Sequence, residues 1–408
     1  MSKQVQDAYI VAAARTPIGR APKGVFRHLR PDDLLVHALR AALAQVPGLD
    51  PAAIEDAIVG CAIPEAEQGL NVARIGALLA GLPDTVGGAT VNRFCASGLT
   101  ALAMAADRIR VGEADLMIAA GTESMSMVPM MGNRPSLNPR VLADENVGIA
   151  YGMGLTAEKV AQQWKVPREA QDAFALESHR KAIAAQQAGE FGDEIAPIEV
   201  VTRLPDLGSG EIVVDTRPVA LDEGPRADTS LEALARLRPA FAAARDPSGK
   251  ATGMGSVTAG NSSQTSDGAG ALIVASEAAV KRFGLSPLAR FVSFSVRGVP
   301  PQIMGIGPKE AIPAALARAG LKQEAIDWIE LNEAFAAQAL AVIGDLGLDP
   351  SKVNPMGGAI ALGHPLGATG AIRAATVVHA LRRRQLRYGM VTMCVGTGMG
   401  AAGILERV

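Results

Sequence analysis

The chain has 408 residues, of which 49% are hydrophobic and 20% are charged, and its formal net charge at pH 7 is −2. A chain of this length normally folds as two or three packed units, and this composition excludes an intrinsically disordered protein. The near-neutral balance argues against a general nucleic-acid-binding surface, while it leaves room for a local basic patch that binds a phosphorylated ligand.

The cysteines and the N-terminal segment indicate the cellular compartment of the protein. Three cysteines without C-x-x-C pairing argue against a disulfide framework and for a reducing compartment. The first twenty residues lack the charged start and long apolar core of a signal peptide, and no apolar run reaches the roughly 18 residues that cross a bilayer. We therefore expect a cytoplasmic protein that binds neither membranes nor nucleic acid.

In the first third of the chain, short apolar runs alternate with a helical pattern. The predicted strands are residues 7–15, 54–62, 88–94 and 114–121. Between the last two, one face of a predicted helix carries Leu99, Leu102, Ala103, Ala106 and Ile109. This alternation predicts a mainly parallel sheet covered by helices.

The pattern changes near Ser124. From there to about Gly260 the chain holds the Met-rich "SMSMVPMM", a helical stretch over 155–189 and many loops rich in Pro, Gly, Asp and Arg. We interpret this segment as an inserted loop domain. The strand-like residues 270–276 then resume the α/β pattern.

The last third repeats the order of the first. Residues 325–332 and 389–396 are predicted strands, and residues 357–370 form a glycine-rich turn. The helix after that turn has one apolar face, formed by Ala374, Val377, Val378 and Leu381. In each half a turn with a reactive residue, Cys95 or His364, opens a helix that leads to a strand, which indicates a duplicated unit.

Cys95 lies in "VNRFCASGL" (91–99), directly before good helix-forming sequence. A thiol at a helix N-terminus feels the positive end of the helix dipole, which lowers its pKa and favours the nucleophilic thiolate. This stretch alone slightly favours a second interpretation, in which Cys95 is a small buried structural side chain. Cys61, without a distinctive neighbour, is interpreted as structural.

His364 lies among the glycines of "ALGHPLGATG", which permit tight turns, and Pro365 suits the first turn of a helix. A histidine in this place can act as a base or as a donor to an oxyanion, although a plain structural turn remains an alternative. Asn332 in "ELNEAFA" is a candidate helix N-cap or a residue whose amide holds a water or an oxyanion.

Cys394 ends a predicted strand and is followed by "VGTGMG". These glycines do not follow the G-x-G-x-x-G spacing and lead into a strand-like segment, so we reject a dinucleotide site. Candidate metal ligands are scattered singly, which argues against a metal centre. Two thiols and one histidine can instead transfer an acyl group, since one thiolate attacks a carbonyl and the other moves a proton on or off carbon.

At these residues the chain resembles the thiolases, and the resemblance covers essentially its whole length. Four segments resemble the active-site motifs of that family: "VNRFCASGL", "NEAFA" (332–336), "GGAIALGHPLGATG" and "CVGTGMG" (394–400). The resemblance implies that Cys95 is the acylated nucleophile and that Cys394 is the acid/base at the α-carbon. It implies that His364 activates Cys95 and, with a water on Asn332, forms one oxyanion hole, while the N–H groups of Cys95 and Gly396 form the second.

The resemblance also implies the fold and the ligands. We expect two similar βαβαβαββ halves in a layered αβαβα arrangement, with residues 1–124 and 266–286 as the first half and 287–408 as the second. Residues 125–265 would be the inserted loop domain that binds coenzyme A (CoA). Ser263 would contact the pantetheine arm of CoA and Arg226 its nucleotide end. CoA and acyl-CoA would be substrates, no cofactor would be bound permanently, and the chain would form a homodimer or homotetramer.

One departure from the family pattern bears on specificity. Acetoacetyl-specific biosynthetic thiolases typically have a histidine where "YGMGLTAE" has Gly152. This favours a degradative enzyme that cleaves 3-ketoacyl-CoA of longer chain length with CoA, giving acetyl-CoA and a shortened acyl-CoA. The Met-rich segment could form an adaptable wall for the acyl tail or pack at an interface. The alternatives are a biosynthetic acetoacetyl-CoA thiolase and a non-catalytic acyl-CoA carrier; a ketoacyl-synthase-type enzyme is disfavoured by Cys394.

Overall fold

A computed structural model describes residues 5–206, 208–241 and 255–408. Residues 1–4, 207 and 242–254 lie outside the described residues, and the last two of these fall within the predicted loop domain. The described chain alternates strands and helices in both its first and its last third.

The first half builds a five-stranded core sheet in the order β4-β3-β5-β8-β1. Its strands are β1 (Ala8–Arg15), β3 (Asp56–Gly60), β4 (Ala89–Val91), β5 (Leu116–Ser124) and β8 (Ser266–Ser276). β3 runs parallel to β4 and β5, whereas β8 is antiparallel to both β5 and β1, so the sheet is mixed and the prediction of a mainly parallel sheet is wrong. Every residue of β5 and β8 is buried, as expected for strands covered on both faces. A two-residue strand, β2 (Gly19–Arg20), pairs with β8.

The second half repeats this order as β10-β11-β12-β9. Its strands are β9 (Ala289–Gly298), β10 (Trp328–Leu331), β11 (Tyr388–Val395) and β12 (Met399–Arg407). Where β4 flanks β3 in the first half, a single parallel bridge between Ile329 and Val353 flanks β10 in the second. A short pairing of β1 with β9 joins the two sheets. The duplicated unit predicted from the sequence is therefore confirmed.

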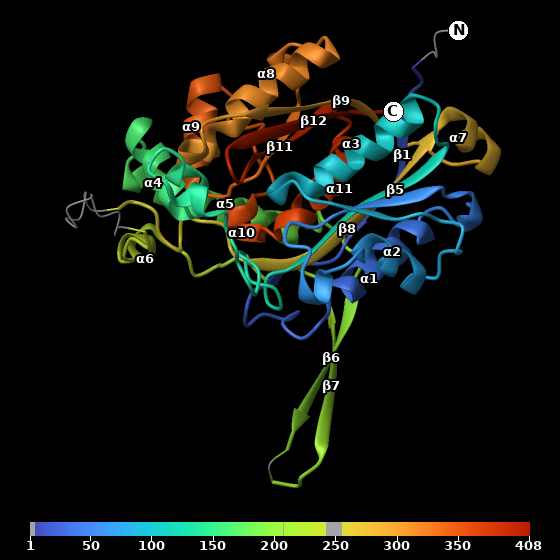
Figure 1. Ribbon diagram of the computed structural model, residues 1–408, viewed down its shortest axis with the longest axis horizontal. Coiled ribbons are helices and arrows are strands. Elements are labelled where there is room, and N and C mark those ends of the chain that lie inside the picture. The colour runs from blue at the N-terminus through green and yellow to red at the C-terminus, as the bar shows by residue number, and fades with distance from the viewer. Residues whose placement is uncertain (1–4, 207, 242–254) are drawn as a thin grey trace.

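Helices occupy three layers around these sheets (Figure 1). Between the sheets lie α3 (Ser97–Arg110) and α11 (Thr369–Arg383), which share one hydrophobic core. The outer face of the first sheet is covered by α1 (Pro31–Ala44) and α2 (Val72–Leu79). The outer face of the second is covered by α8 (Gly307–Ala319) and α9 (Ala336–Leu346). This is the predicted αβαβα arrangement.

The two central helices touch at their N-terminal ends. A Cβ atom on Gly370 of α11 would overlap the backbone nitrogen of Leu99, and one on Gly98 of α3 would lie 2.7 Å from the backbone nitrogen of Ala371. Glycine is therefore required on both helices for this approach. Because the turns that carry Cys95 and His364 precede these two helix ends, the close packing also brings the two reactive residues together.

We expect Gly370→Ala to destabilise the protein by about 1–3 kcal/mol, because the added methyl group must push α3 and α11 apart. Gly344→Ala is the matched control, since a Cβ there meets nothing within 4 Å and Ala favours the interior of α9. Urea unfolding measured on both variants checks this expectation. Equal stability of the two variants would contradict the tight helix contact.

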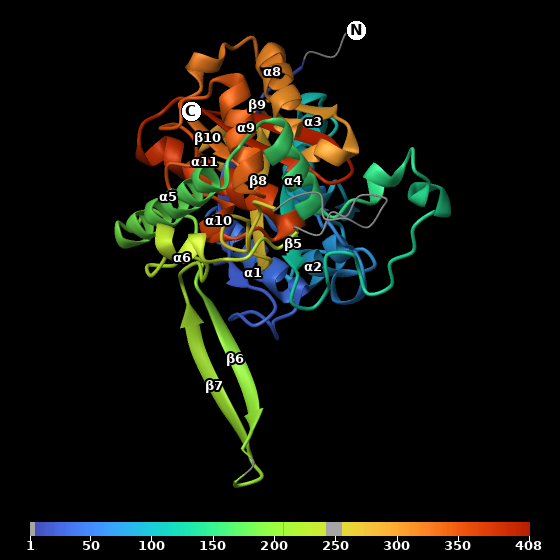
Figure 2. The same ribbon diagram turned by 90° about the vertical axis from the view of Figure 1, so that its left-hand side faces the viewer.

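The inserted segment differs in detail from its prediction. The helical stretch predicted over 155–189 is two helices, α4 (Met153–Gln163) and α5 (Arg168–Gln187), because Lys165 between them adopts a left-handed φ of 54°. A long hairpin of β6 (Ile198–Pro205) and β7 (Ile212–Val219), which the sequence analysis had read as loops, projects from the body (Figures 1 and 2). The short helices α6 (Leu231–Ala235), α7 (Glu277–Phe283) and α10 (Ala359–Leu362) complete the fold.

A buried ion cluster ties the inserted segment to β1. The Arg15 guanidinium donates to Glu194 at 2.6 Å and to Asp222 at 2.7 Å, and all three side chains are almost completely buried. Buried charges require such pairing because an unpaired one is costly to desolvate. The cluster thus fixes where the chain enters and leaves the hairpin.

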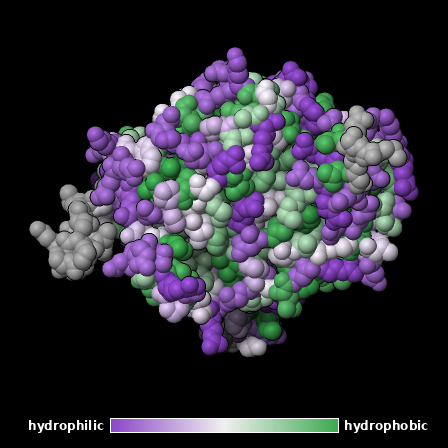
Figure 3. Space-filling view, turned by 45° about the horizontal axis from the view of Figure 1, so that its top comes forward, coloured by the Kyte–Doolittle hydropathy of each residue, from purple (hydrophilic) through white to green (hydrophobic). Residues whose placement is uncertain are grey.

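The surface has no single character on the face drawn in Figure 3, where hydrophilic and hydrophobic residues are interspersed. Among the helices that the structure describes, none combines the length and apolar composition needed to cross a membrane.

Candidate active site

Four chain segments meet where the two central helices begin. Cys95 lies in a 3-10 turn (Phe94–Ala96) just before α3, and His364 lies between α10 and the turn that leads into α11. Cys394 is near the end of β11, and Asn332 directly follows β10. The Asn332 backbone N–H donates to the carbonyl of Thr392 at 2.9 Å, which fixes the Asn332 segment beside the strand that carries Cys394.

The predicted catalytic residues come together at this point. The Asn332 amide nitrogen lies 3.4 Å from His364 Nε2. The backbone N–H groups of Cys95 and Gly396 both interact with the Cys95 sulfur, and a charge on Cys95 is felt by Cys394. Residues separated by hundreds of positions in the sequence therefore share one small volume.

Burial dominates the titration of Cys95. Its side chain is 8% exposed, and desolvation raises the pKa of the thiol to about 12, although the N–H groups of Cys95 and Gly396 act in the opposite direction. The expectation that the helix terminus would lower this pKa is wrong. The free energy lost when the thiolate is removed from water is larger than the free energy gained from its two backbone N–H donors.

His364 is uncharged for the same reason. It is 4% exposed, and burial lowers the pKa of its imidazole to about 3, with the positive charge of Arg373 acting in the same direction. The resting site therefore holds a neutral thiol and a neutral imidazole. Proton transfer between them needs a ligand that stabilises the charge as it develops.

Apolar side chains surround Cys394. It is fully buried and packs with Ala157, Val257, Met304 and Phe335. Burial raises the pKa of this thiol, and negative charge on Cys95 raises it further. Cys394 is therefore protonated at rest and can give its proton to a carbanion.

Two residues that were not predicted from the sequence contact His364. The Thr369 hydroxyl lies 2.6 Å from His364 Nδ1. The His364 backbone N–H donates to Ser266 Oγ at 3.1 Å. A hydroxyl residue shortly after the histidine in "GHPLGAT" was visible in the sequence, but only the folded turn shows that it reaches the ring.

Two buried carboxylates, also missed, hold the loops of the site. Glu123 accepts from the backbone N–H groups of Ala62 and Gly367, both at 2.8 Å, and so ties the histidine turn to the end of β3. Glu333 accepts from Ser178 Oγ at 2.7 Å and from the Ile360 N–H at 3.1 Å. A carboxylate within an apolar run, as in "IAAGTES", is the signal that could have revealed Glu123, because buried acids need partners.

The backbone is strained on both sides of the reactive thiols. Phe94, directly before Cys95, has a φ of 43°, and Thr397, directly after Gly396, has a φ of 64°. Residues other than glycine avoid this left-handed region, and such conformations concentrate at functional sites. The strain supports the assignment of these two turns to the active site.

A cavity of about 750 Å³ lies beside the catalytic turns. Both predicted CoA-binding residues, Ser263 and Arg226, line it, together with the cations Arg20 and Lys23. The chain at one side of this cavity continues to the catalytic residues, since Ser263 N–H donates to the Ala334 carbonyl and Thr265 pairs with His364. The predicted residues are thus brought to one cavity with cationic side chains at its wall.

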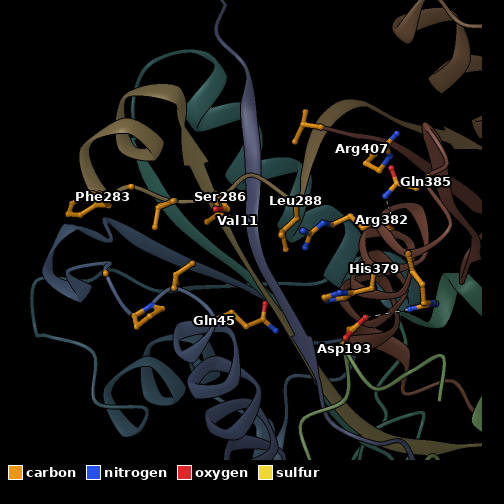
Figure 4. Close-up of a pocket in the computed structure, with 17 residues that line it drawn as sticks. Val11, Gln45, Asp193, Phe283, Ser286, Leu288, His379, Arg382, Gln385 and Arg407 are labelled. Carbon is orange, nitrogen blue, oxygen red and sulfur yellow. Dashed lines mark hydrogen bonds and ion pairs between the residues drawn. The ribbon is translucent and has the colours of Figure 1, made fainter.

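A second cavity, of about 900 Å³, lies at the opposite end of α11 (Figure 4). It is lined by His379 and Arg382 of α11, by Leu288 and by the end of β12, and contains none of the predicted catalytic residues. Asp193 on its wall pairs with Arg383 at 3.9 Å. Because this cavity lies away from the turns that carry Cys95 and His364, it is not the candidate active site.

Among the described residues, no group of three or more His, Cys, Asp or Glu side chains has a geometry that could hold a metal ion.

The methionines of the Met-rich segment do not form a single wall of one cavity. Met125 is 8% exposed and packs in the core between the sheets, whereas Met131 is 61% exposed. The methionines in the apolar cluster around Cys394 are Met304 and Met153 instead.

Comparisons with known proteins agree with this geometry. Residues 8–278 match the family model "Thiolase, N-terminal domain" and residues 285–407 match "Thiolase, C-terminal domain". The chain is 49% identical to a 3-ketoacyl-CoA thiolase of Bacillus subtilis (strain 168), over 98% of this chain and 100% of that one. It is 44% identical to a beta-ketoadipyl-CoA thiolase of Pseudomonas aeruginosa, over 99% and 100% of the two chains.

Solved structures show the same likeness. Human mitochondrial 3-ketoacyl-CoA thiolase in complex with CoA superposes with a TM-score of 0.86 at 38% identity, covering 99% of each chain. The acetyl-CoA acetyltransferase of Bacillus anthracis gives a TM-score of 0.86 at 39% identity, covering 100% of each. With matched motifs, fold and site, the chain belongs to the thiolase family of acyltransferases.

Proposed function

We propose that this chain cleaves 3-ketoacyl-CoA with CoA, giving acetyl-CoA and an acyl-CoA shortened by two carbons. The observation that carries this proposal is the pair of buried thiols, Cys95 and Cys394, that share one site with His364 beside a cavity of coenzyme size. One thiol alone would support acyl transfer, but a second protonated thiol is suited to carbon–carbon bond cleavage.

The first half-reaction begins when the C3 carbonyl of the substrate approaches Cys95. The Cys95 proton passes to His364, and the sulfur bonds to C3. The C2–C3 bond then breaks, its electron pair moves onto C2 and the thioester carbonyl, and Cys394 delivers its proton to C2. Acetyl-CoA leaves, the acyl group remains on Cys95, and Cys394 is left as a thiolate.

In the second half-reaction the thiol of a second CoA gives its proton to the Cys394 thiolate and attacks the acyl carbon. The acyl–sulfur bond to Cys95 breaks and the shortened acyl-CoA departs. The Cys95 sulfur recovers its proton from His364, so both thiols return to their resting state. In this cycle every proton that one group releases is taken up by another group.

Two oxygens carry negative charge during the cycle. The N–H groups of Cys95 and Gly396, which already face the Cys95 sulfur, are positioned to bind the oxyanion on C3. His364 and a water held by Asn332 would bind the thioester enolate oxygen. The buried Asn332 Oδ1 has no partner among the described residues, which suits it to hold such a water.

For CoA we propose binding in the cavity of about 750 Å³, as a substrate and without any permanently bound cofactor. Ser263 lies on the wall nearest the catalytic turns and would contact the pantetheine arm. Arg226 is exposed on the same cavity and would meet the nucleotide end. The inserted segment 125–265 supplies both residues, which supports its interpretation as the CoA-binding domain.

We also propose a homodimer or homotetramer in the cytoplasm. The short strand β4 is the edge of its sheet, and beside it Leu70 is 90% exposed, which suits a face covered by a second copy. The three cysteines of the chain are free, as a reducing compartment requires.

Chain-length preference depends in this proposal on Gly152. It caps α4 with a φ of −62°, and a Cβ there would meet nothing within 4 Å. The glycine at this position, where acetoacetyl-specific biosynthetic thiolases typically have a histidine, supports a degradative enzyme that takes long acyl chains. The alternative, an acetoacetyl-CoA thiolase working in the biosynthetic direction, is favoured by the equally good match to an acetyl-CoA acetyltransferase structure.

A thiolysis assay over a series of 3-ketoacyl-CoA substrates, starting from acetoacetyl-CoA, tests this proposal. We expect kcat/KM to be maintained or to rise with chain length, and Gly152→His to lower it by about tenfold for long chains with little effect on acetoacetyl-CoA. Gly152→Ala is the control for adding a side chain without bulk. Activity confined to acetoacetyl-CoA in the unmodified chain would favour the biosynthetic alternative.

A further inference from the structure

Thr369 makes one contact whose chemistry is not used by the roles assigned above. It is the first residue of α11 and is 1% exposed. Its hydroxyl lies 2.6 Å from His364 Nδ1, and the structure gives this side chain no other hydrogen bond among the described residues. This distance is that of a hydrogen bond between the hydroxyl and the ring nitrogen.

The direction of that bond depends on the tautomer of the ring, so the contact made by the other ring nitrogen matters. Nε2 of His364 lies 3.4 Å from the Asn332 amide nitrogen, which can only donate. With the Asn332 amide nitrogen on this side, Nε2 is the acceptor, which places the ring hydrogen of the neutral imidazole on Nδ1, facing the Thr369 oxygen. In the opposite arrangement two donors, Nε2–H and the Asn332 amide, would face each other.

The Nδ1–H form is the one that the reaction needs. Its free Nε2 can take the proton of Cys95, after which the same Nε2–H can donate to an oxyanion. Nδ1–H remains a donor before and after that transfer, so a single fixed acceptor serves both states. Catalytic histidines commonly have a carboxylate or carbonyl oxygen in this place.

We propose that Thr369 is a positioning residue that fixes the tautomer and orientation of His364, as a neutral counterpart of the carboxylate that orients histidine in other enzymes. The inference rests on the proposed function for its kinetic consequence, but the tautomer itself does not depend on the substrate. A hydroxyl suits this site because a carboxylate would add charge to a volume that already keeps both thiols and the ring neutral.

The test compares Thr369→Val, which keeps the shape and removes the hydroxyl, with Thr369→Ser, which keeps the hydroxyl. We expect Thr369→Val to lower kcat by roughly tenfold to a hundredfold with KM nearly unchanged, and Thr369→Ser to stay within about threefold of the unmodified enzyme. In a His364→Asn background, Thr369→Val is expected to cause no further loss, because its effect acts through the ring.

Nitrogen-15 NMR of histidine-labelled protein reads the tautomer directly, with the His364 signals assigned by their loss in His364→Asn. Protonation of Nδ1 in the unmodified chain, and its loss or exchange with the Nε2–H form in Thr369→Val, are expected. The proposal is overturned if the ring is protonated on Nε2, if Thr369→Val retains full kcat, or if Val and Ser variants lose equal activity. If the NMR result holds while no 3-ketoacyl-CoA is cleaved, the proposed function fails and the positioning role stands.

Discussion

Cys95→Ala is expected to abolish the acyl-enzyme and to lower thiolysis by about 10⁴-fold or more. The reason is that this side chain forms the only covalent bond to the acyl group in the proposed cycle. No other group can replace it, since Cys394 is needed as the proton donor and Cys61 is buried beside Glu123, 4.0 Å from that carboxylate.

Intact-protein mass spectrometry after mixing with acetyl-CoA checks this result. The unmodified chain should gain the mass of one acetyl group, located on Cys95 by peptide mapping, and Cys95→Ala should gain none. Cys61→Ala is the matched control, because burial and Glu123 raise the pKa of that thiol and keep it inert. The proposed mechanism is falsified if Cys95→Ala cleaves acetoacetyl-CoA at near the unmodified rate, and acetylation absent from the unmodified chain would point to a non-catalytic carrier.

The architecture was largely predictable because it depends on local patterns. Strands such as β1 and β5 appear as apolar runs, and the face of α3 repeats at helical spacing, so both could be read from the sequence. The duplication could be read from the order of elements alone. The projecting β6–β7 hairpin could not, because β7 is almost entirely exposed and carries no buried face to reveal its period.

The site was predictable as a list of residues but not as an environment. Glycine turns and a family resemblance pointed to Cys95, His364 and Cys394, whereas the titration of these groups depends on burial by segments far away in the sequence. The helix terminus has a favourable effect on the Cys95 thiolate, but the desolvation of the buried sulfur is larger. Glu123 was missed because its role is a contact across the fold, and Thr369 because only the folded turn shows that its hydroxyl reaches the ring.

The neutral resting state has a consequence for pH. The pKa of Cys95 is raised to about 12 and that of His364 is lowered to about 3, so neither group of the free protein changes charge between pH 5 and 9. Activation therefore has to accompany ligand binding, when a carbonyl oxygen enters the hole formed by Cys95 and Gly396 and offsets the cost of the buried thiolate. The site therefore differs from the active sites of enzymes whose catalytic cysteine is already a thiolate before the substrate binds.

Cys394→Ala is expected to separate the two chemical tasks of the site. It removes the proton donor to C2, so cleavage of 3-ketoacyl-CoA should fall by about 10³-fold. Acetylation of Cys95 by acetyl-CoA should persist, because exchange of one thioester for another moves no proton at carbon. Cys394→Ser tests whether lost packing is responsible, since it fills the space with a hydroxyl that is a far weaker acid, and we expect it to be as inactive in cleavage as the Ala variant.

Exchange of the acetyl hydrogens of acetyl-CoA in deuterated water measures the proton step without cleavage. The unmodified chain should catalyse this exchange and both Cys394 variants should not, while mass spectrometry shows Cys95 still acetylated in all three. Cleavage at the unmodified rate in either variant would assign the proton to another group, and His364 would then be the candidate nearest the site. Loss of Cys95 acetylation together with cleavage would instead mean that Cys394 acts on the nucleophile, because the two thiols lie close enough for charge on one to raise the pKa of the other.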